Sequence, residues 1–284
     1  MDDVIDIHTH VISSDTTRYP LDPHGGKQSD WSRTRPVGAA ALLAEMDAAG
    51  VAKAAVVQAS TAYGFDNSYV ADTVAAHPDR FTGVFSIDVF GADACAQLDH
   101  WMAAGLTGLR LFTTGSTSPG QADWLADPRS FPVWERAQAA NLPICLQMRP
   151  EGLPDLLKLL DRFRTVPIIL DHLARPVLSD GPPYRAAKWL FDLAAYPNVF
   201  LKLTSRTIEQ SSEGDSTPEA FFSRLIAAFG ADRIAWGSNF PAHAGPMSRI
   251  LDAAREGLAC LSAAERAAIF ARTARRLYPA LARR

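Results

Sequence analysis

The stretch VIDIHTH (Val4–His10) begins with a short apolar run and ends in a polar segment with two histidines. Side chains alternate between the two faces of a β-strand, so we expect Asp6, His8 and His10 to share one face. An apolar start followed by a polar end is typical of a buried parallel strand whose carboxyl end supplies reactive groups. The same pattern recurs along the chain, and this recurrence decides the predicted fold.

Short apolar runs alternate with amphipathic stretches from the first residues to the last. The predicted strands are Val4–Ile7, Ala54–Val57, Gly83–Ile87, Leu109–Phe112, Pro143–Leu146, Pro167–Leu170, Val199–Leu203 and Arg233–Trp236. The predicted helices are Val37–Ala49, Asn67–His77, Ala92–Ala103, Phe131–Ala140, Leu153–Phe163, Pro183–Ala195, Pro218–Phe229, Met247–Glu256 and Ser262–Leu277. Eight such units predict an α/β fold, a single (β/α)8 TIM-type barrel over residues 1–284. A doubly wound sheet is disfavoured because the sequence has no glycine-rich phosphate loop.

Composition limits the class of protein and its partners. Of the 284 residues, 48% are hydrophobic and 21% are charged, which is ordinary for a globular chain. The net charge of −3 provides no basic field, so we expect no nucleic-acid partner. No apolar run approaches the roughly 18 residues of a membrane span, so we expect no membrane partner. Three scattered cysteines, Cys95, Cys145 and Cys260, favour a reducing, cytoplasmic location. The oligomeric state stays open.

A long polar segment, Val11–Pro36, follows the first predicted strand. Loops of this length are usually functional or disordered. In a barrel this segment would lie at the mouth formed by the carboxyl ends of the strands. We therefore interpret it as a lid, and His24 within it as a residue that could close over a substrate.

The carboxyl ends of all eight predicted strands carry polar groups, and in a barrel these ends meet at one pocket. They are Asp6, His8, His10, Gln58, Ser60, Asp88, Arg110, Gln147, Arg149, Asp171, His172, Lys202, Thr204, Ser205, Arg206, Ser238 and Asn239. His8 and His10 could together reach one metal ion or one substrate oxygen. His172 would join them from the sixth strand, whereas we expect the adjacent Asp171 to point the other way and to be structural.

Arg110 interrupts an otherwise apolar strand and needs a partner there. It could grip a substrate carboxylate in a bidentate manner, or it could form an internal salt bridge with Asp6 or Asp88. The candidates for helping to bind a substrate are Gln58, Ser60, Gln147, Lys202 and Arg206, and each could instead satisfy buried polar groups. Cys145 is expected to be a core thiol.

Five segments in this order resemble the amidohydrolase-related family. They are Ile5–His10, Gln58–Ser60 with Asp66-Asn67, Gly108–Arg110, Leu170–Leu173 with Arg175-Pro176, and Trp236–Pro241. The likeness is to the branch with 2-pyrone-4,6-dicarboxylate lactonase and the sugar-acid lactonases. It implies a (β/α)8 hydrolase in which His8, His10 and His172 are the site histidines and Arg110 holds a substrate carboxylate. It also implies either no cofactor or one divalent metal ion, zinc or manganese, on the three histidines.

Asn239 departs from the family pattern, which has an aspartate at this position of the eighth strand. An amide cannot take up a proton, so the base is expected to be His172 or one of the first-strand histidines, while Asn239 holds the water. The leading hypothesis is hydrolysis of a small carboxylate-bearing lactone. The alternatives are a metal-dependent decarboxylase of a small aromatic or enol acid, and a non-catalytic barrel that binds a small acid.

Overall fold

The computed structural model describes residues 3–115 and 120–282, so residues 1–2, 116–119 and 283–284 of the predicted domain lie outside the described residues. Eight parallel strands form one sheet in the order of the sequence. They are β1 (Val4–Thr9), β2 (Val51–Val57), β3 (Phe81–Phe85), β4 (Gly108–Phe112), β5 (Ile144–Gln147), β6 (Ile168–Asp171), β7 (Val199–Leu203) and β8 (Ile234–Trp236). The predicted (β/α)8 barrel is therefore confirmed.

The sheet closes on itself where β8 returns to β1. The contact is a single parallel bridge between Thr9 and Phe240, beside a hydrogen bond from the His10 amide to the Phe240 carbonyl of 2.9 Å. This seam lies just beyond the end of β8, so the segment after β8 is held against the histidine end of β1.

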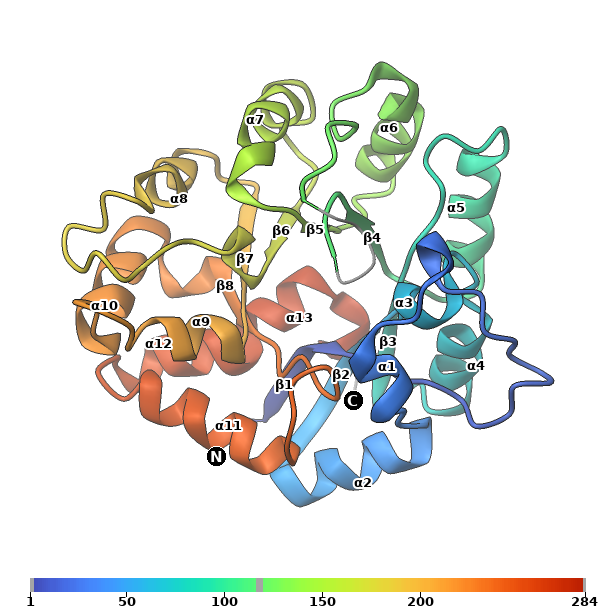
Figure 1. Cartoon of the computed structure of the whole chain (residues 1–284), viewed down its shortest axis with the longest axis horizontal. Helices are drawn as coiled ribbons and strands as arrows, with labels where there is room; N and C mark the ends of the chain where they lie inside the picture. Colours follow the sequence, from blue (N-terminus) through green and yellow to red (C-terminus); the bar gives the residue numbers. More distant parts are fainter. Residues whose placement is uncertain (1–2, 116–119, 283–284) are drawn as a thin grey trace.

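Helices surround the barrel, as Figure 1 shows. The helices that follow strands or precede the next strand are α2 (Ala39–Ala49), α4 (Ser68–Ala76), α5 (Ala94–Ala103), α6 (Phe131–Ala139), α7 (Leu153–Arg162), α8 (Lys188–Asp192), α10 (Pro218–Phe229), α11 (Met247–Gly257), α12 (Ala263–Ala267) and α13 (Thr273–Leu277). Three short helices lie in the segments at the strand ends: α1 (Asp30–Thr34), α3 (Ser60–Tyr63) and α9 (Ser205–Gln210).

The predicted helices differ from the observed ones mainly in length. The stretch predicted as Pro183–Ala195 is helical only as α8 and a 3₁₀ turn, Leu193–Ala195. The stretch predicted as Ser262–Leu277 is interrupted by a π-helical turn, Ala268–Arg272. The short helices α1, α3 and α9 are absent from the prediction, because each has too few residues to show an amphipathic period.

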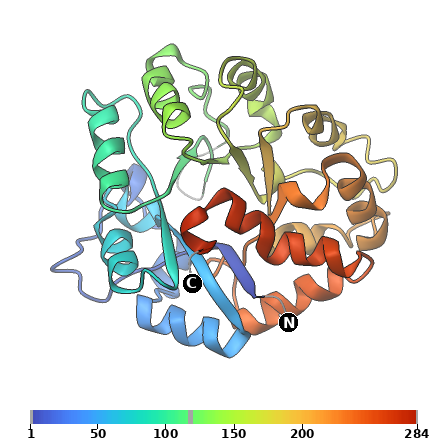
Figure 2. The ribbon, with the colours of Figure 1, turned by 180° about the vertical axis from the view of Figure 1, so that it is seen from behind.

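Two apolar layers hold the barrel together. Outward-facing strand residues pack against the surrounding helices. Inward-facing residues such as Ile169 and Phe200 pack with Ala274, Leu277 and Tyr278 of the C-terminal segment. Figure 2 shows this last segment lying across the centre of the barrel on the side away from the viewer of Figure 1. The C-terminal segment thus packs with apolar side chains against the amino-terminal end of the barrel.

The long segment after β1 lies over one side of the carboxyl end of the barrel, with α1 near α3 and the ends of β2 and β3 (Figure 1). Ser29 caps α1 by accepting the Ser32 amide, and its hydroxyl also contacts Thr61 of α3. Arg35 donates to the carbonyl oxygens of Pro241 and Ala242 across the seam. Within the described residues, none of the helices is both long and apolar enough to traverse a lipid bilayer.

Candidate active site

A polar cavity of about 190 Å³ lies at the carboxyl end of the barrel. Seven strands or the segments after them contribute to its wall, together with Trp31 of α1. The lining residues are His10, Trp31, Ala59, Ser60, Thr61, Arg110, Phe112, Thr114, Gly115, Gln147, His172, Arg175, Arg206, Asn239 and Ala242. The cavity therefore gathers seven of the residues singled out from the sequence: His10, Ser60, Arg110, Gln147, His172, Arg206 and Asn239.

Three histidine rings meet at the inner end of this cavity. The His8 ring lies 4.9 Å from that of His10 and 5.1 Å from that of His172, centre to centre, and both pairs are edge to face. His10 and His172 line the cavity, whereas His8 is completely buried behind them. The indole of Trp31 covers the His10 ring at 5.1 Å, so the segment after β1 does lie over the histidines.

Lys202 is fully buried below the histidines and has an acceptor for each of its ammonium hydrogens. Its Nζ lies 2.6 Å from Asp171 Oδ1, 3.1 Å from His8 Nδ1 and 3.3 Å from Cys145 Sγ. An ammonium group only donates hydrogen bonds, so His8 Nδ1 must be the acceptor. A neutral His8 therefore carries its proton on Nε2, an atom that has no partner among the described residues.

The other two histidines are oriented by different partners. His10 Nδ1 lies 2.8 Å from the carbonyl oxygen of Val57, which can only accept, so Nδ1 carries the proton and Nε2 keeps its lone pair. His172 Nδ1 lies 2.7 Å from Thr204 Oγ1, which can donate or accept. The site thus presents at least one imidazole lone pair, on His10, next to the cavity.

Burial and nearby cations keep all three imidazoles neutral. Burial, and then the charge of Arg110, lower the pKa of His10 to about 3. Burial also lowers the pKa of His172 to about 3, although the charge of Asp171 acts in the opposite direction. Burial, and then Lys202, lower the pKa of His8 well below its ordinary value. Neutral imidazoles can act as bases or hydrogen-bond donors at neutral pH.

Asp171 lies inside the barrel, and the prediction that it points the other way is wrong. Its two carboxylate oxygens pair with Lys202 and, at 3.0 Å, with Arg110 Nε. Alternation from the inward-facing Ile169 places Asp171 inside, and β6 then ends, so His172 also turns inward with a φ of 55°. Burial alone would raise the pKa of Asp171, but the charges of Lys202 and Arg110 lower it well below its ordinary value.

The internal salt bridge considered for Arg110 exists, but its partner is Asp171 rather than Asp6 or Asp88. Arg110 also donates from Nη2 to Gln147 Oε1 at 2.7 Å. The guanidinium nevertheless lines the cavity, where Arg175 and Arg206 join it. Burial, and then the charges of Arg206, Arg149 and Arg110, lower the pKa of Arg175, so these arginines feel one another's charge. Several guanidinium groups around one cavity are suited to an anion.

A left-handed turn sets the positions of His172 and Arg175. The residues from His172 to Arg175 all have φ between 53° and 60°, and none of them is a glycine. Each such residue costs roughly 1–2 kcal/mol in this region. The amide of Arg175 returns to the His172 carbonyl at 2.9 Å, which holds both side chains at the cavity. Strain of this kind is frequent at functional sites.

Other candidates lie outside the cavity wall. Gln58 is buried and its amide donates to the Asp66 carbonyl. Asp6 is not part of the cavity wall either. Its Oδ1 accepts hydrogen bonds from the backbone amides of His8 and Ser238. A register shift between Asp6 and Thr9 interrupts the strict alternation expected for residues 6, 8 and 10. Cys145 is fully buried between Lys202 and Tyr278, as expected for a core thiol.

The residues present do not fit a divalent metal ion on the three histidines. His8 accepts from Lys202 and so has a proton, not a lone pair, on Nε2. Asn239 provides no anionic ligand, and Lys202 and Arg110 add positive charge nearby. Within residues 3–115 and 120–282, no group of three or more histidine, cysteine, aspartate or glutamate side chains is arranged to hold a metal ion.

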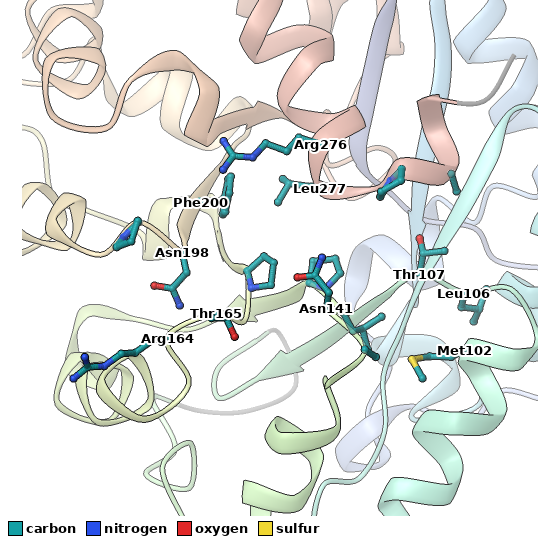
Figure 3. A pocket seen from close by; sticks show the side chains of 17 residues that line it. Met102, Leu106, Thr107, Asn141, Arg164, Thr165, Asn198, Phe200, Arg276 and Leu277 are labelled. Atoms are coloured by element: carbon teal, nitrogen blue, oxygen red, sulfur yellow. The ribbon is translucent and has the colours of Figure 1, made fainter. Parts of the chain in front are cut away.

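A larger hollow of about 750 Å³ lies at the opposite end of the barrel. Figure 3 shows its wall, with Phe200 and Leu277 close to Arg276, and with Asn198 and Arg164 on the left of the view. It contains no histidine, aspartate, glutamate or cysteine among its lining residues. The smaller cavity at the carboxyl end, and not this hollow, has the groups needed for chemistry.

Comparison with known proteins gives a consistent result. The model of the family described as Amidohydrolase matches residues 5–280. The chain is 32% identical over 123 residues to L-fucono-1,5-lactonase of Burkholderia ambifaria, over 42% of this chain and 41% of that protein. It is 28% identical over 205 residues to 4-sulfomuconolactone hydrolase of Rhizobium radiobacter, over 72% of this chain and 65% of that protein. The matched part is thus less than two thirds of each relative's length.

A solved structure extends the likeness to the whole barrel. A candidate 2-pyrone-4,6-dicarboxylic acid hydrolase of Pseudomonas putida superposes with a TM-score of 0.78 and 22% identity, over 99% of this chain and 98% of that one. At this identity the likeness shows the fold alone.

Proposed function

Since the chain belongs to the amidohydrolase family, we propose that it hydrolyses a small lactone that carries one or more carboxylates. The observation on which this rests is one cavity in which neutral imidazoles lie beside a group of guanidinium side chains. The imidazoles offer proton transfer, and the guanidinium groups offer a place for an anion. The names of two relatives, a fuconolactonase and a sulfomuconolactone hydrolase, support the lactone class.

Arg110, Arg175 and Arg206 would bind the acidic groups of the substrate. Arg110 is already held by Asp171 and Gln147, so its free donors keep a fixed direction toward the cavity. Pre-organised donors of this kind bind a carboxylate without ordering a flexible side chain. The three arginines suit a substrate with more than one negative group.

His10 would act as the base for the attacking water. Its Nε2 has the lone pair, because Nδ1 donates to the Val57 carbonyl. With the cavity empty, burial and Arg110 hold the pKa of His10 at about 3, so it is a weak base. A bound carboxylate would offset the charge of Arg110 and raise that pKa. An anionic substrate would thus activate its own base, and a neutral lactone would not.

The hydrolysis itself needs one water and no other reactant. The water oxygen, held by Asn239, bonds to the carbonyl carbon while His10 takes the proton. The negative charge that develops on the carbonyl oxygen would be stabilised by Arg110 and by an N–H of His172. The bond from that carbon to the ring oxygen then breaks, and the ring oxygen receives the proton from His10. The product is the open hydroxy acid.

His8 and Lys202 would be positioning residues in this scheme. Neither lines the cavity, and Lys202 fixes the tautomer of His8 behind the two exposed imidazoles. The alternative of a metal-dependent decarboxylase is not favoured, because the donor set of this site does not suit a metal. A non-catalytic acid-binding barrel would share the arginines but would not need the lone pair on His10.

A lactone panel tests the proposal. Purified protein is assayed with a pH indicator against carboxylate-bearing lactones and the methyl esters of the same compounds, with and without chelator. We expect turnover of the acids only, lost in His10→Gln and kept in His100→Gln, which changes an exposed histidine of α5. Thermal stabilisation by the acids with no turnover of any lactone would reject the enzyme and leave the binding protein.

A further inference from the structure

We propose that a second cavity next to the histidines is a subsite for an aromatic ring attached to the substrate; this inference rests on the proposed function and narrows its substrate class. We call this cavity the aromatic side pocket. Its volume is about 260 Å³, and it lies between the ends of β3 and β4 and the segment after β1.

Five of its ten lining residues carry a ring. Phe65 and Phe112 stack at 6.0 Å with 22° between their planes, and the His24 ring meets them at 5.3 and 4.9 Å. The rings of Phe90 and Trp124, which also line the pocket, meet edge to face at 5.7 Å. Five rings from separate parts of the chain therefore surround one space.

The aromatic side pocket shares two wall residues with the histidine cavity. Arg110 and Phe112 line both. A molecule whose carboxylate is bound by Arg110 would thus have the aromatic side pocket within reach of its neighbouring substituent. The shared arginine is the reason for assigning this space to part of the substrate and not to a separate ligand.

The size and chemistry of the space suit a single ring. An apolar cavity of about 150 Å³ is enough to hold benzene, so about 260 Å³ accommodates a phenyl group with room to orient. Aromatic walls favour stacked or edge-to-face contacts with such a group. Asp88 and Arg110 also line the space and could bind one or two hydroxyl groups, but the other hydroxyl groups of a sugar chain would face rings or aliphatic side chains, which is unfavourable. The aromatic side pocket therefore favours aryl-substituted lactone acids over sugar lactones.

Two dicarboxylates test the subsite without requiring turnover. Calorimetry compares the Kd of phenylsuccinate with that of succinate, which has the same charge but no ring. Burial of the ring should make phenylsuccinate bind about 10-fold more tightly, or more. Trp124→Ala and Phe65→Ala should each reduce this ratio to about threefold or less. The matched control is Trp101→Ala, a half-buried tryptophan of α5 outside both cavities, which should leave the ratio unchanged.

Two lactones test it in the reaction. The kcat/KM of phenylparaconate is compared with that of paraconate, the same five-membered lactone acid without the ring. We expect the phenyl compound to be preferred by about 10-fold, with the preference lost in Trp124→Ala and Phe65→Ala. Hydrolysis of paraconate with no preference for its phenyl derivative would overturn the subsite and leave the lactonase standing.

The two proposals can fail separately. If neither lactone is opened, the lactonase is rejected, and the ratio of the two dicarboxylate Kd values still decides the subsite. Equal affinity for phenylsuccinate and succinate, or a ratio unchanged in both aromatic variants, would overturn the subsite whatever the activity.

Discussion

Lowering the pH from 6.5 to 5 should destabilise this protein through its buried histidines. In the folded chain, burial holds the pKa of His10 and of His172 at about 3, against an ordinary value of 6.5. Between these values the unfolded chain binds a proton at each position and the folded chain does not. The free energy of unfolding therefore falls as the pH falls below 6.5.

The size of the effect follows from the pKa values. The unfolded histidine is half protonated at pH 6.5 and almost fully protonated at pH 5, so each histidine contributes about 1.6 kcal/mol and the two together lose about 3 kcal/mol. His8 acts in the same direction. Asp6 acts in the opposite direction, because burial raises its pKa to about 6 and its protonation below that pH favours the folded state. This offsets about 1.2 kcal/mol, so a net loss of about 2 kcal/mol or more is expected.

Urea unfolding at several pH values measures this loss. The wild-type protein is compared with His10→Gln and His172→Gln, each of which should lose about 2 kcal/mol less between pH 6.5 and 5. When the pH-dependent loss in each variant is subtracted from that of the wild type, the contribution of the carboxyl groups cancels. His100→Gln, at an exposed position, serves as the control and should follow the wild type. The claim that these imidazoles are neutral and buried would be refuted if the free energy of unfolding of the wild type stayed constant from pH 6.5 to 5. It would also be refuted if that free energy fell as steeply with pH in both variants as in the wild type.

Other substitutions test the remaining parts of the site. In urea titrations at pH 7, Lys202→Met should lower the free energy of unfolding by about 3–5 kcal/mol, because Asp171 then keeps only Arg110 as a partner inside the barrel. The control is Lys188→Met, which breaks an exposed ion pair and should lower it by at most about 1 kcal/mol. Arg110→Lys should raise the KM for an anionic lactone by about tenfold or more, since a point charge replaces the fixed fork; an unchanged KM in steady-state kinetics would contradict the assigned anion site. Asn239→Asp should raise kcat by about tenfold or more by adding a carboxylate base beside the water, and an unchanged kcat would place Asn239 away from the reacting atoms. Dialysis against a chelator should leave both activity and melting temperature unchanged, and loss of activity that added zinc restores would show that the donor set was misread.

The fold was predictable because it depends on a repeated pattern. Every predicted apolar run coincides with a strand, from β1 to β8, since buried parallel strands need continuous apolar residues. Length was harder to predict, as for α8, because Pro182 and Pro183 and the turn around Tyr184 delay the start of that helix. The short helices at the strand ends depend on tertiary contacts such as that of Ser29 with Thr61, which no local pattern reveals.

The site was predictable in its members but not in its connections. Polar residues at strand ends identified His10, Arg110, His172 and Asn239, all of which line the cavity. The role of Asp171 was missed, because the left-handed turn after it breaks the alternation on which the prediction relied and includes no glycine to signal it. Trp31 was missed because a single tryptophan in a long polar segment has no periodic partner.

The rings of His24, Phe65 and Phe112 were equally invisible as a group. They are separated by some forty residues each along the chain, and only the return of the segment after β1 over β4 brings them into contact. The sequence shows Phe112 as the end of a strand, His24 as part of the long segment after the first strand and Phe65 as part of a connection, with nothing that links the three.

The C-terminal segment also has a consequence for handling the protein. Tyr278 touches Cys145, Cys145 touches Lys202, and Lys202 touches His8, so a continuous column of side chains joins the tail of the polypeptide to the imidazoles. A deletion that removed Tyr278 would open the amino-terminal end of the barrel and let solvent reach Lys202 from that end. A truncation far from the cavity would then disturb the contacts that support the histidines from below. An affinity tag should therefore be added after the last residue and should not replace the residues around Tyr278.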